Sequence, residues 1–296
     1  MKLFKILGTM FFFYSCNAQP KQAALKVNAD DNSLLWEVNG MGLKKPSYLF
    51  GTFHMMCKDD IHFSEQLKTA LTNSSLVYLE MDMDDPAVML GGLLLMNMKD
   101  GKKLQDLYTA EEYQKVASYF KDSLRMPIGF LQSTKPFFLA AMLYPKMMPC
   151  KTLSGVEEEL MKLAKQQKKE IKGLETIEFQ SSVFDSIPYE DQAKELLKSI
   201  DSMSSYQKYF DTMITVYKTQ QLKEIETLFK DTEFGMEDHQ DLLLNDRNKN
   251  WVSQLKTIMK DESVFVAVGA GHLVGKQGLI NLLREEGYTL KPILNK

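Results

Sequence analysis

Two histidines occupy matching positions in this chain, each three residues after a glycine that follows an apolar run. His54 ends the segment GTFH at residues 51–54, and His272 ends the segment GAGH at residues 269–272. The apolar runs predict buried strands, and side chains just beyond the carboxyl ends of strands in an α/β protein face an open crevice. Neutral imidazoles are common metal ligands. Since the chain has only four histidines, the pattern predicts that these two form the halves of one polar site.

A simpler interpretation is open for each segment taken alone. Glycine permits a sharp exit from a strand, so either glycine could do no more than end its strand while the histidine packs locally. The remaining histidines, His62 and His239, lie among acidic and polar residues. That setting favours solvated ion pairs over metal ligation.

Several further motifs, in order along the chain, resemble the TraB/GumN family, which includes the Tiki proteases of animals. Leu79-Glu80 matches the acidic motif that accompanies paired glycine–histidine segments, and Arg247-Asn248 with Trp251 matches an arginine motif. The remaining matches are residues 155–164, 173–180 and 269–288. The resemblance runs from about residue 34 to residue 292 and implies one domain, which we place at residues 34–296.

The residue types support a metal-dependent hydrolase. Two imidazoles and a carboxylate are a common ligand set for manganese, cobalt or zinc, and His54, His272 and Glu80 supply such a set. A divalent metal there would activate water and polarise a carbonyl, giving hydrolysis of an amide or ester without a protein nucleophile. Resemblance to the Tiki branch implies that the substrate is a peptide or protein.

Three more charged residues could take part in catalysis beside Glu80. Arg247 would stabilise a developing oxyanion or hold a substrate carboxylate. Glu175 and Glu157 are candidates for a general base, and Glu175 is preferred because it leaves a short predicted strand. A helix-capping or ion-paired role for Glu175 stays open.

Other mechanisms lack their sequence signatures. The chain has no G-x-S-x-G segment for a serine nucleophile, no HExxH, no P-loop and no GxGxxG. A net charge of −3 gives no electrostatic case for binding nucleic acid. Two alternatives to a hydrolase remain. One is a non-catalytic cell-envelope protein that binds or sequesters peptide signals on the same fold, which the resemblance also allows, and the other is a haem or iron binder.

The N-terminal segment predicts export. Residues 1–15 have the basic start and short apolar stretch of a signal peptide. Ser15 before Cys16 favours a bacterial lipoprotein in which Cys16 is acylated and residues 16–33 tether the domain to a membrane. Alternatively, cleavage after Ala18 would discard Cys16 and release the protein. Both alternatives place the protein in the bacterial cell envelope, facing the periplasm or the surface.

Export leaves Cys57 and Cys150 in an oxidising compartment, where we expect them to form a disulfide. Such a bond would join the loop of His54 to the segment before Gly155. The rival interpretation makes Cys57 a metal ligand beside His54. Neither the compartment nor the family motif favours that rival.

The elements around these residues predict an α/β fold with a mixed central β-sheet, flanking helices and a helical cap from the middle of the chain. Residues 34–38 and 48–52 predict an antiparallel hairpin at the start of the sheet. Residues 106–144 predict two helices, begun by a capping box at residues 109–112 and interrupted by prolines. Residues 189–229 carry the helical pattern that we assign to the cap.

Methionines and leucines make residues 89–98 strongly apolar. Because the chain has 19 methionines throughout, we expect this stretch to fill the core. Methionine also suits surfaces that accept varied apolar partners. A groove for an extended apolar peptide is therefore the alternative.

Overall fold

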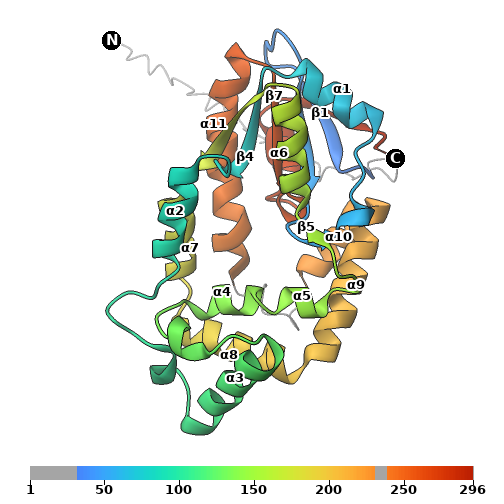
Figure 1. The fold of residues 1–296 in the computed structure, drawn as a ribbon. Coiled ribbons are helices and arrows are strands. Elements are labelled where there is room, and N and C mark those ends of the chain that lie inside the picture. Colours follow the sequence, from blue (N-terminus) through green and yellow to red (C-terminus); the bar gives the residue numbers. More distant parts are fainter. Residues whose placement is uncertain (1–31, 231–238, 296) are drawn as a thin grey trace, which may run out of the picture. The chain divides into compact units, whose positions relative to one another are not determined.

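The computed structural model describes residues 32–230 and 239–295. Residues 31–296 separate from residues 1–30 as a unit of their own, and the fold described here is that of this unit (Figure 1). The expected signal peptide, Cys16 and nearly all of the tether lie outside the described residues. No helix within residues 32–230 or 239–295 is long and apolar enough to cross a membrane.

Six strands form the central sheet, in the order β6-β4-β7-β2-β1-β8. Parallel pairs join β2 to β7, β7 to β4 and β4 to β6, whereas β1 runs antiparallel to both β2 and β8. The strands are β1 (Leu35–Asn39), β2 (Ser47–Thr52), β4 (Leu76–Met81), β6 (Glu170–Glu175), β7 (Val264–Gly269) and β8 (Thr289–Ile293). The expected fold class, α/β with a mixed central sheet, is confirmed.

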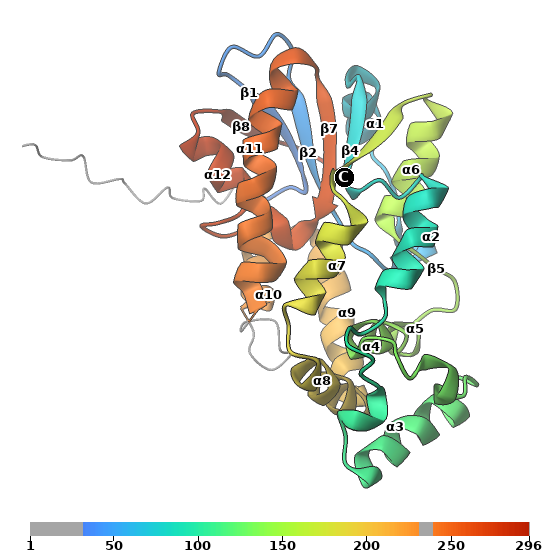
Figure 2. The same cartoon turned by 90° about the vertical axis from the view of Figure 1, so that its left-hand side faces the viewer.

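The parallel strands are apolar because helices cover both faces of the sheet. Every residue of β7 except the last is buried, and Phe265 lies in register with Tyr48 of β2. The covering helices are α11 (Asp246–Asp261) and α12 (Leu279–Glu285) on one face, and α1 (Glu65–Asn73) and α6 (Val156–Gln166) on the other (Figure 2). This layering holds the carboxyl ends of β2, β7, β4 and β6 at one rigid edge.

Helices from the middle of the chain form a cap beyond the carboxyl ends of the parallel strands (Figure 1). They are α3 (Ala110–Ser123), α4 (Pro136–Ala141), α5 (Tyr144–Met147), α8 (Tyr189–Asp201), α9 (Met203–Thr219) and α10 (Leu222–Phe229). The cap expected over residues 189–229 is thus confirmed.

The prediction of two helices in residues 106–144 is partly wrong. Thr109 and Glu112 form the expected capping box at the start of α3, where each accepts a hydrogen bond from the other's backbone nitrogen. Pro136, however, begins the short α4 instead of interrupting a longer helix. The physical reason is that proline lacks a backbone N–H and has its φ preset for the first helical turn.

Two helices that follow neighbouring strands, α2 (Pro86–Leu95) after β4 and α7 (Ile177–Asp185) after β6, pack against each other. The expectation that residues 89–98 fill the core is wrong for much of α2, because Leu90, Leu93 and Leu94 are between 60% and 75% exposed. Met98, beyond the helix, is buried. A helix that is apolar on all sides leaves leucines in solvent when only part of its surface has a packing partner.

Candidate functional site

The carboxyl ends of the parallel strands bring the predicted site residues together. Glu80 lies near the end of β4, and Glu175 is the last residue of β6. His54 follows β2 by two residues, and His272 ends a short 3₁₀ turn directly after β7. Arg247 comes from the first turn of α11. Five side chains from five segments therefore reach one edge of the sheet.

Gly51 allows the two histidine segments to approach each other. β2 and β7 are parallel neighbours. A Cβ atom on Gly51 would lie 2.8 Å from Cδ1 of Leu273 and 3.2 Å from Cα of Ala270, so both neighbours would have to shift. The absence of a side chain at residue 51 thus lets the turn that carries His272 pack closely against the end of β2.

Gly269, the last residue of β7, marks the point around which the three predicted metal ligands lie. A Cβ atom there would be 3.4 Å from Oε1 of Glu80, 3.7 Å from Nε2 of His54 and 3.7 Å from Cδ2 of His272. Because glycine has no Cβ, this space stays open. The structure thus places both histidine segments beside one small space next to Glu80.

Arg247 is buried in the site and bonded on every side. Its Nε and Nη2 donate to the carboxylate of Glu175 at 3.0 and 2.8 Å, and Nη2 also donates to Oε2 of Glu80 at 2.6 Å. Nη1 donates to the carbonyl of Leu243 at 2.9 Å and lies 3.3 Å from Nε2 of His272. A guanidinium suits this place because its fixed fork of donors can serve two carboxylates and a carbonyl at once.

His272 is buried and held in one tautomer. Its Nδ1 lies 2.7 Å from Oδ1 of Asn248, whose Nδ2 donates to the carbonyl of Gln277 at 2.8 Å. Because that amide oxygen can only accept, His272 carries its proton on Nδ1 and presents a lone pair at Nε2. Burial lowers the pKa of His272 to about 3, although the Glu80 carboxylate opposes this, so the imidazole is neutral at physiological pH.

His54 is far more open, with 75% of its side chain exposed. Its Nδ1 lies 2.8 Å from Oε1 of Glu157, and the same oxygen accepts a hydrogen bond from Oγ1 of Thr52 at 2.5 Å. Desolvation in the crevice lowers the pKa of His54, but Glu157 outweighs it and raises the pKa to about 9. A ligand that uses Nε2 at neutral pH must therefore displace a proton.

The two carboxylates around Arg247 differ in pKa. Burial opposes the charge on Glu80, but His272 and Arg247 outweigh it and hold the pKa of Glu80 well below its ordinary value. Since His272 is neutral at physiological pH, Arg247 is the main partner there. Burial raises the pKa of Glu175 despite its bonds to Arg247. Two buried carboxylates therefore share one guanidinium, which leaves room for a further positive charge.

The donor set fits a divalent metal in its chemistry, although it is not closed around one. Both imidazoles have Nδ1 engaged by an oxygen, the arrangement typical of metal-binding histidines. Nε2 of His272 faces Nη1 of Arg247 at 3.3 Å, and Nε2 of His54 carries a proton at neutral pH. Nε2 of His272 and Oε1 of Glu80 are 3.8 Å apart. In the part of the chain that the structure describes, no group of three His, Cys, Asp or Glu residues is placed to hold a metal ion. Arg247, in contact with Glu80 and His272, would have to shift for the donors to close on one ion.

The model of the TraB/PrgY/gumN family matches residues 34–292. The chain belongs to this family. The match covers every strand of the sheet, ending within β8, and every residue of the site. It confirms the resemblance found in the motifs. No solved structure matches the chain.

Relatives of this family member include proteins named metalloproteases. Metalloprotease TIKI1 of Danio rerio is 23% identical over 89% of this chain and 63% of its own length. Metalloprotease TIKI2 of Xenopus tropicalis is 23% identical over 90% of this chain and 61% of its own length. Metalloprotease TIKI1 of Homo sapiens is 29% identical over 38% of this chain and 21% of its own length. The chain thus spans less than two thirds of the length of these relatives.

A disulfide holds the loop that carries the first family histidine. Cys57 and Cys150, the pair expected to bond, are joined at 2.09 Å across 93 residues of sequence. Cys57 belongs to the short strand β3 (Met56–Cys57), which pairs with β5 (Leu153–Ser154) just before Glu157. The loop of His54 and the helix of Glu157 are therefore linked covalently as well as by strand pairing. In this state Cys57 cannot act as a metal ligand.

Two polar residues complete the site without having been predicted for it. Asn248 orients His272, and Thr52 bonds the carboxylate that holds His54. A signal existed for Asn248, because it directly follows Arg247 in the family's arginine motif. Thr52 lies inside the GTFH segment, but its pairing with Glu157 had no signal, because the packing of α6 against the sheet brings that residue to it.

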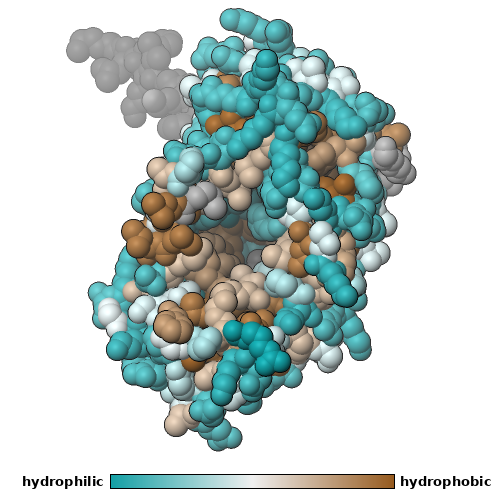
Figure 3. Space-filling view, viewed as in Figure 1, coloured by the Kyte–Doolittle hydropathy of each residue, from teal (hydrophilic) through white to brown (hydrophobic). Residues whose placement is uncertain are grey.

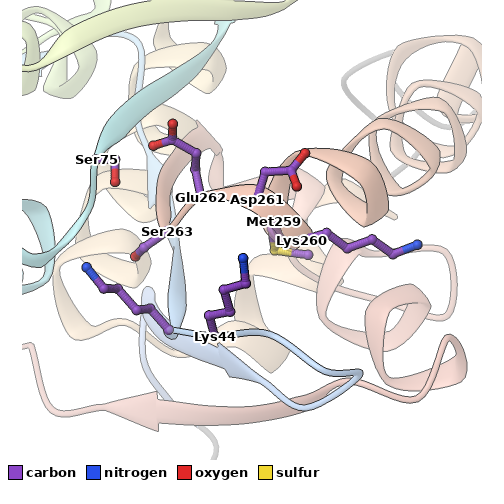
Figure 4. A pocket seen from close by; sticks show the side chains of 8 residues that line it. Lys44, Ser75, Met259, Lys260, Asp261, Glu262 and Ser263 are labelled. Carbon is purple, nitrogen blue, oxygen red and sulfur yellow. The ribbon is translucent and has the colours of Figure 1, made fainter.

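The molecule is hollowed on the side toward which the carboxyl ends of the parallel strands point. Figure 3 shows this hollow between the helices around the sheet and the helical cap, with apolar surface along part of its rim. A separate cavity of about 100 Å³ lies at the opposite ends of β4 and β7, where Lys44, Ser75 and Glu262 line it (Figure 4). That cavity holds no more than a few water molecules and takes no part in the site.

Proposed function

We propose that this chain is a metal-dependent hydrolase that cleaves peptide bonds, using a divalent metal (manganese, cobalt or zinc) held by His54, His272 and Glu80. The observation that carries the proposal is that Nε2 of His54, Cδ2 of His272 and Oε1 of Glu80 all border the open space beside Gly269. Similarity to proteins named metalloproteases supports a peptide as the substrate.

The side chains around that space would bind and orient the reactants. When bound, the metal supplies an activated water and polarises the substrate carbonyl. Arg247 is placed to hold the negative charge that develops on the carbonyl oxygen, or a substrate carboxylate. Glu175 fixes the plane of the guanidinium through Nε and Nη2. Asn248 and Glu157 keep the two imidazoles in the tautomer that leaves Nε2 available.

Glu175 and Glu157 suit this positioning role better than the predicted role of general base. The Glu175 side chain has no exposed surface and bonds Arg247, while Glu157 holds His54 and Thr52. A general base needs a lone pair that can reach the reacting proton. Glu80 is then the carboxylate that borders the open space.

One observation favours a second candidate, a non-catalytic protein that binds peptides at the same place. Both predicted bases, Glu175 and Glu157, are engaged in ion pairs and are not free to accept a proton. Catalytic hydrogen bonds often form only in the substrate complex, so the hydrolase stays the first candidate. Turnover of peptides decides between the two.

Metal content tests the proposed function directly. Residues 21–296 would be purified and analysed for manganese, cobalt, zinc and iron, beside a His54→Ala/His272→Ala variant and a His62→Ala control at an exposed histidine. We expect about one equivalent of divalent metal in the wild type and the control, and none in the double variant. Peptide hydrolysis should follow the metal. A wild type without metal or metal affinity would leave the peptide-binding candidate, and a haem or iron protein would show itself by colour.

We also propose that the protein is exported and anchored to a membrane of the bacterial cell envelope through acylated Cys16. The disulfide between Cys57 and Cys150 supports an oxidising compartment. Mass spectrometry of the mature N-terminus tests this. A diacylglyceryl group on Cys16 is expected, whereas an unmodified N-terminus at Gln19 would show cleavage after Ala18 and a released protein.

A further inference from the structure

A cavity of about 620 Å³ lies between α2 and α7, and nothing in the proposed mechanism uses it. It adjoins the candidate site at two strand ends. Glu175 lines the cavity while its carboxylate bonds Arg247, and Asp82, which also lines it, lies two residues after Glu80. The volume falls within the range of sites that bind a small ligand or a large side chain.

The lining of this cavity combines apolar walls with negative charge. Val88, Leu174 and Ile177 contribute apolar surface, and Asp82 and Glu178 add carboxylates. Its lining includes no lysine, arginine or histidine among the described residues. Asp82 is half-buried, and its Oδ1 has no hydrogen-bond partner in the described part of the chain. Its carboxylate is therefore under-paired, and a cationic ligand in the cavity would be attracted to it without having to contact the shielded oxygen.

The amino ends of α2 and α7 also border the cavity, and by themselves they would favour an anion. Each end already has its own partner. Asp85 accepts a hydrogen bond from the backbone nitrogen of Ala87 at 2.8 Å, and Thr176 accepts one from Phe179 at 3.2 Å. The charge at a helix end is about half a unit, smaller than that of each carboxylate. The cavity therefore stays negative.

An extended peptide can reach this cavity and the candidate site together. β6 is an edge strand of the sheet, and Figure 2 looks onto that edge between α11 and α6. The carboxyl end of β6 leads to the cavity through residues 173–175. A chain lying over this end would place one side chain between α2 and α7 while its neighbours lie toward Arg247.

We propose that this cavity binds the basic side chain, lysine or arginine, of a peptide substrate. The aliphatic stem would lie on the apolar wall and the cationic head beside Asp82 and Glu178. Long basic side chains commonly bury their stems in this way, whereas an acidic side chain would be repelled and a purely apolar one would leave the carboxylates unpaired. The inference rests on the proposed function only in taking the ligand to be a peptide.

Binding of matched peptides tests this without requiring catalysis. Fluorescein-labelled peptides Ala-Ala-Xaa-Ala-Ala, blocked at both ends, would carry lysine, arginine, norleucine, citrulline or glutamate at the central position. Anisotropy titrations in EDTA would give a Kd for each. We expect the lysine and arginine peptides to bind about tenfold more tightly than the norleucine and citrulline peptides, as one partly shielded charge pair provides. The preference should shrink in high salt.

Two variants connect the preference to the cavity. Glu178→Gln, at an exposed position that does not risk the fold, should reduce the tenfold preference to about threefold. Adding Asp82→Asn should bring it close to unity. Glu111→Gln removes an exposed carboxylate from α3 and serves as the matched control, with the preference unchanged.

Four results would overturn the assignment of the cavity. They are equal Kd values for the lysine and norleucine peptides, tighter binding of the glutamate peptide, absence of any peptide binding, and a lysine preference that both cavity variants leave unchanged. The proposed function fails separately. A lysine preference without hydrolysis in added manganese, cobalt or zinc leaves the cavity assignment standing and removes the hydrolase. Hydrolysis without a preference for lysine supports the hydrolase and removes the cavity assignment.

Discussion

Arg247 and Lys135 are both buried cations, but their surroundings differ in charge. Lys135, just before α4, is 1% exposed and bonds through Nζ to the carbonyl of Leu95 at 2.8 Å, to Oγ of Ser181 at 2.9 Å and to Asp185 at 2.8 Å. Three donors thus meet three acceptors, of which Asp185 is the one carboxylate. Arg247 instead lies between two carboxylates and beside a neutral imidazole.

The difference separates a structural cation from one in a functional site. The Lys135 cluster pairs its one carboxylate with two lysines, since Lys99 also lies 2.9 Å from Asp185. It joins the end of α2 to α7, so its natural role is to hold these helices together. The Arg247 cluster holds more negative charge than its guanidinium balances, and it borders an open space lined by histidines. Uneven charge of this kind costs stability and is typical of a place that receives another cation.

The largest effect is expected from a substitution that breaks the cluster around Lys135. Lys135→Met should lower the free energy of unfolding by about 3 kcal/mol, because the carbonyl of Leu95, Ser181 and Asp185 all lose a buried donor. Asp185 keeps only its ion pair with the exposed Lys99 and its hydrogen bond from Tyr189. Urea denaturation measures the loss. Lys102→Met, which removes an exposed ion pair with Glu190, is the control and should cost less than about 1 kcal/mol. Equal losses in both variants would contradict the view that Lys135 is structural.

Arg247→Lys tests the functional cluster. The charge is kept but the fork that serves Glu175 and Glu80 is lost, so kcat/KM for a cleaved peptide should fall by about 100-fold. The free energy of unfolding should change less than in Lys135→Met. Activity within a factor of about two of the wild type would show that the guanidinium does not hold developing charge.

Asn248→Ala tests the orientation of His272. Without Oδ1 of Asn248 the imidazole is free to change tautomer, and affinity for the divalent metal should fall by about 10-fold to 100-fold. Titration calorimetry measures the affinity for the metal. Asn250→Ala, at an exposed position on the same helix, should bind metal like the wild type. The orientation argument is wrong if the two variants bind metal equally well.

The smallest effect concerns pH. With the pKa of His54 raised to about 9, metal binding must release a proton at neutral pH, and the apparent affinity should rise by about tenfold per pH unit up to that value. Glu157→Gln should flatten the dependence of metal affinity on pH. Calorimetry in buffers of different ionisation enthalpy counts the protons, and a count of zero at neutral pH would contradict the raised pKa.

The His54–Glu157 pair also makes stability depend on pH. The stability that the pair contributes is complete below the ordinary pKa of 6.5 and is lost as pH rises through about 9.

Local patterns predicted the fold class and the two histidines, and the family resemblance supplied Glu80, Arg247, Glu175 and Glu157. Neither predicted the hydrogen bonds and ion pairs among these residues. His54 and His272 were predicted because a glycine and an apolar strand precede each at fixed spacing. Glu175 and Glu157 were recognised as site residues, yet their ion pairs depend on how α11 and α6 pack against the sheet, which no local pattern encodes. The exposure of α2 was missed for the same reason, since an apolar helix looks alike whether it is buried or left at an edge.

The bond between Cys57 and Cys150 makes the stability of the His54 loop depend on the redox state of its surroundings. In the chain-entropy model, closing a loop of 93 residues stabilises the folded state by roughly 4–5 kcal/mol. Before oxidation, the loop of His54 is held to the helix of Glu157 by two-residue strands and by the bonds of His54 and Thr52 to the Glu157 carboxylate. The disulfide adds a covalent link to these contacts. Under the proposed export, this link would form when the chain reaches an oxidising compartment.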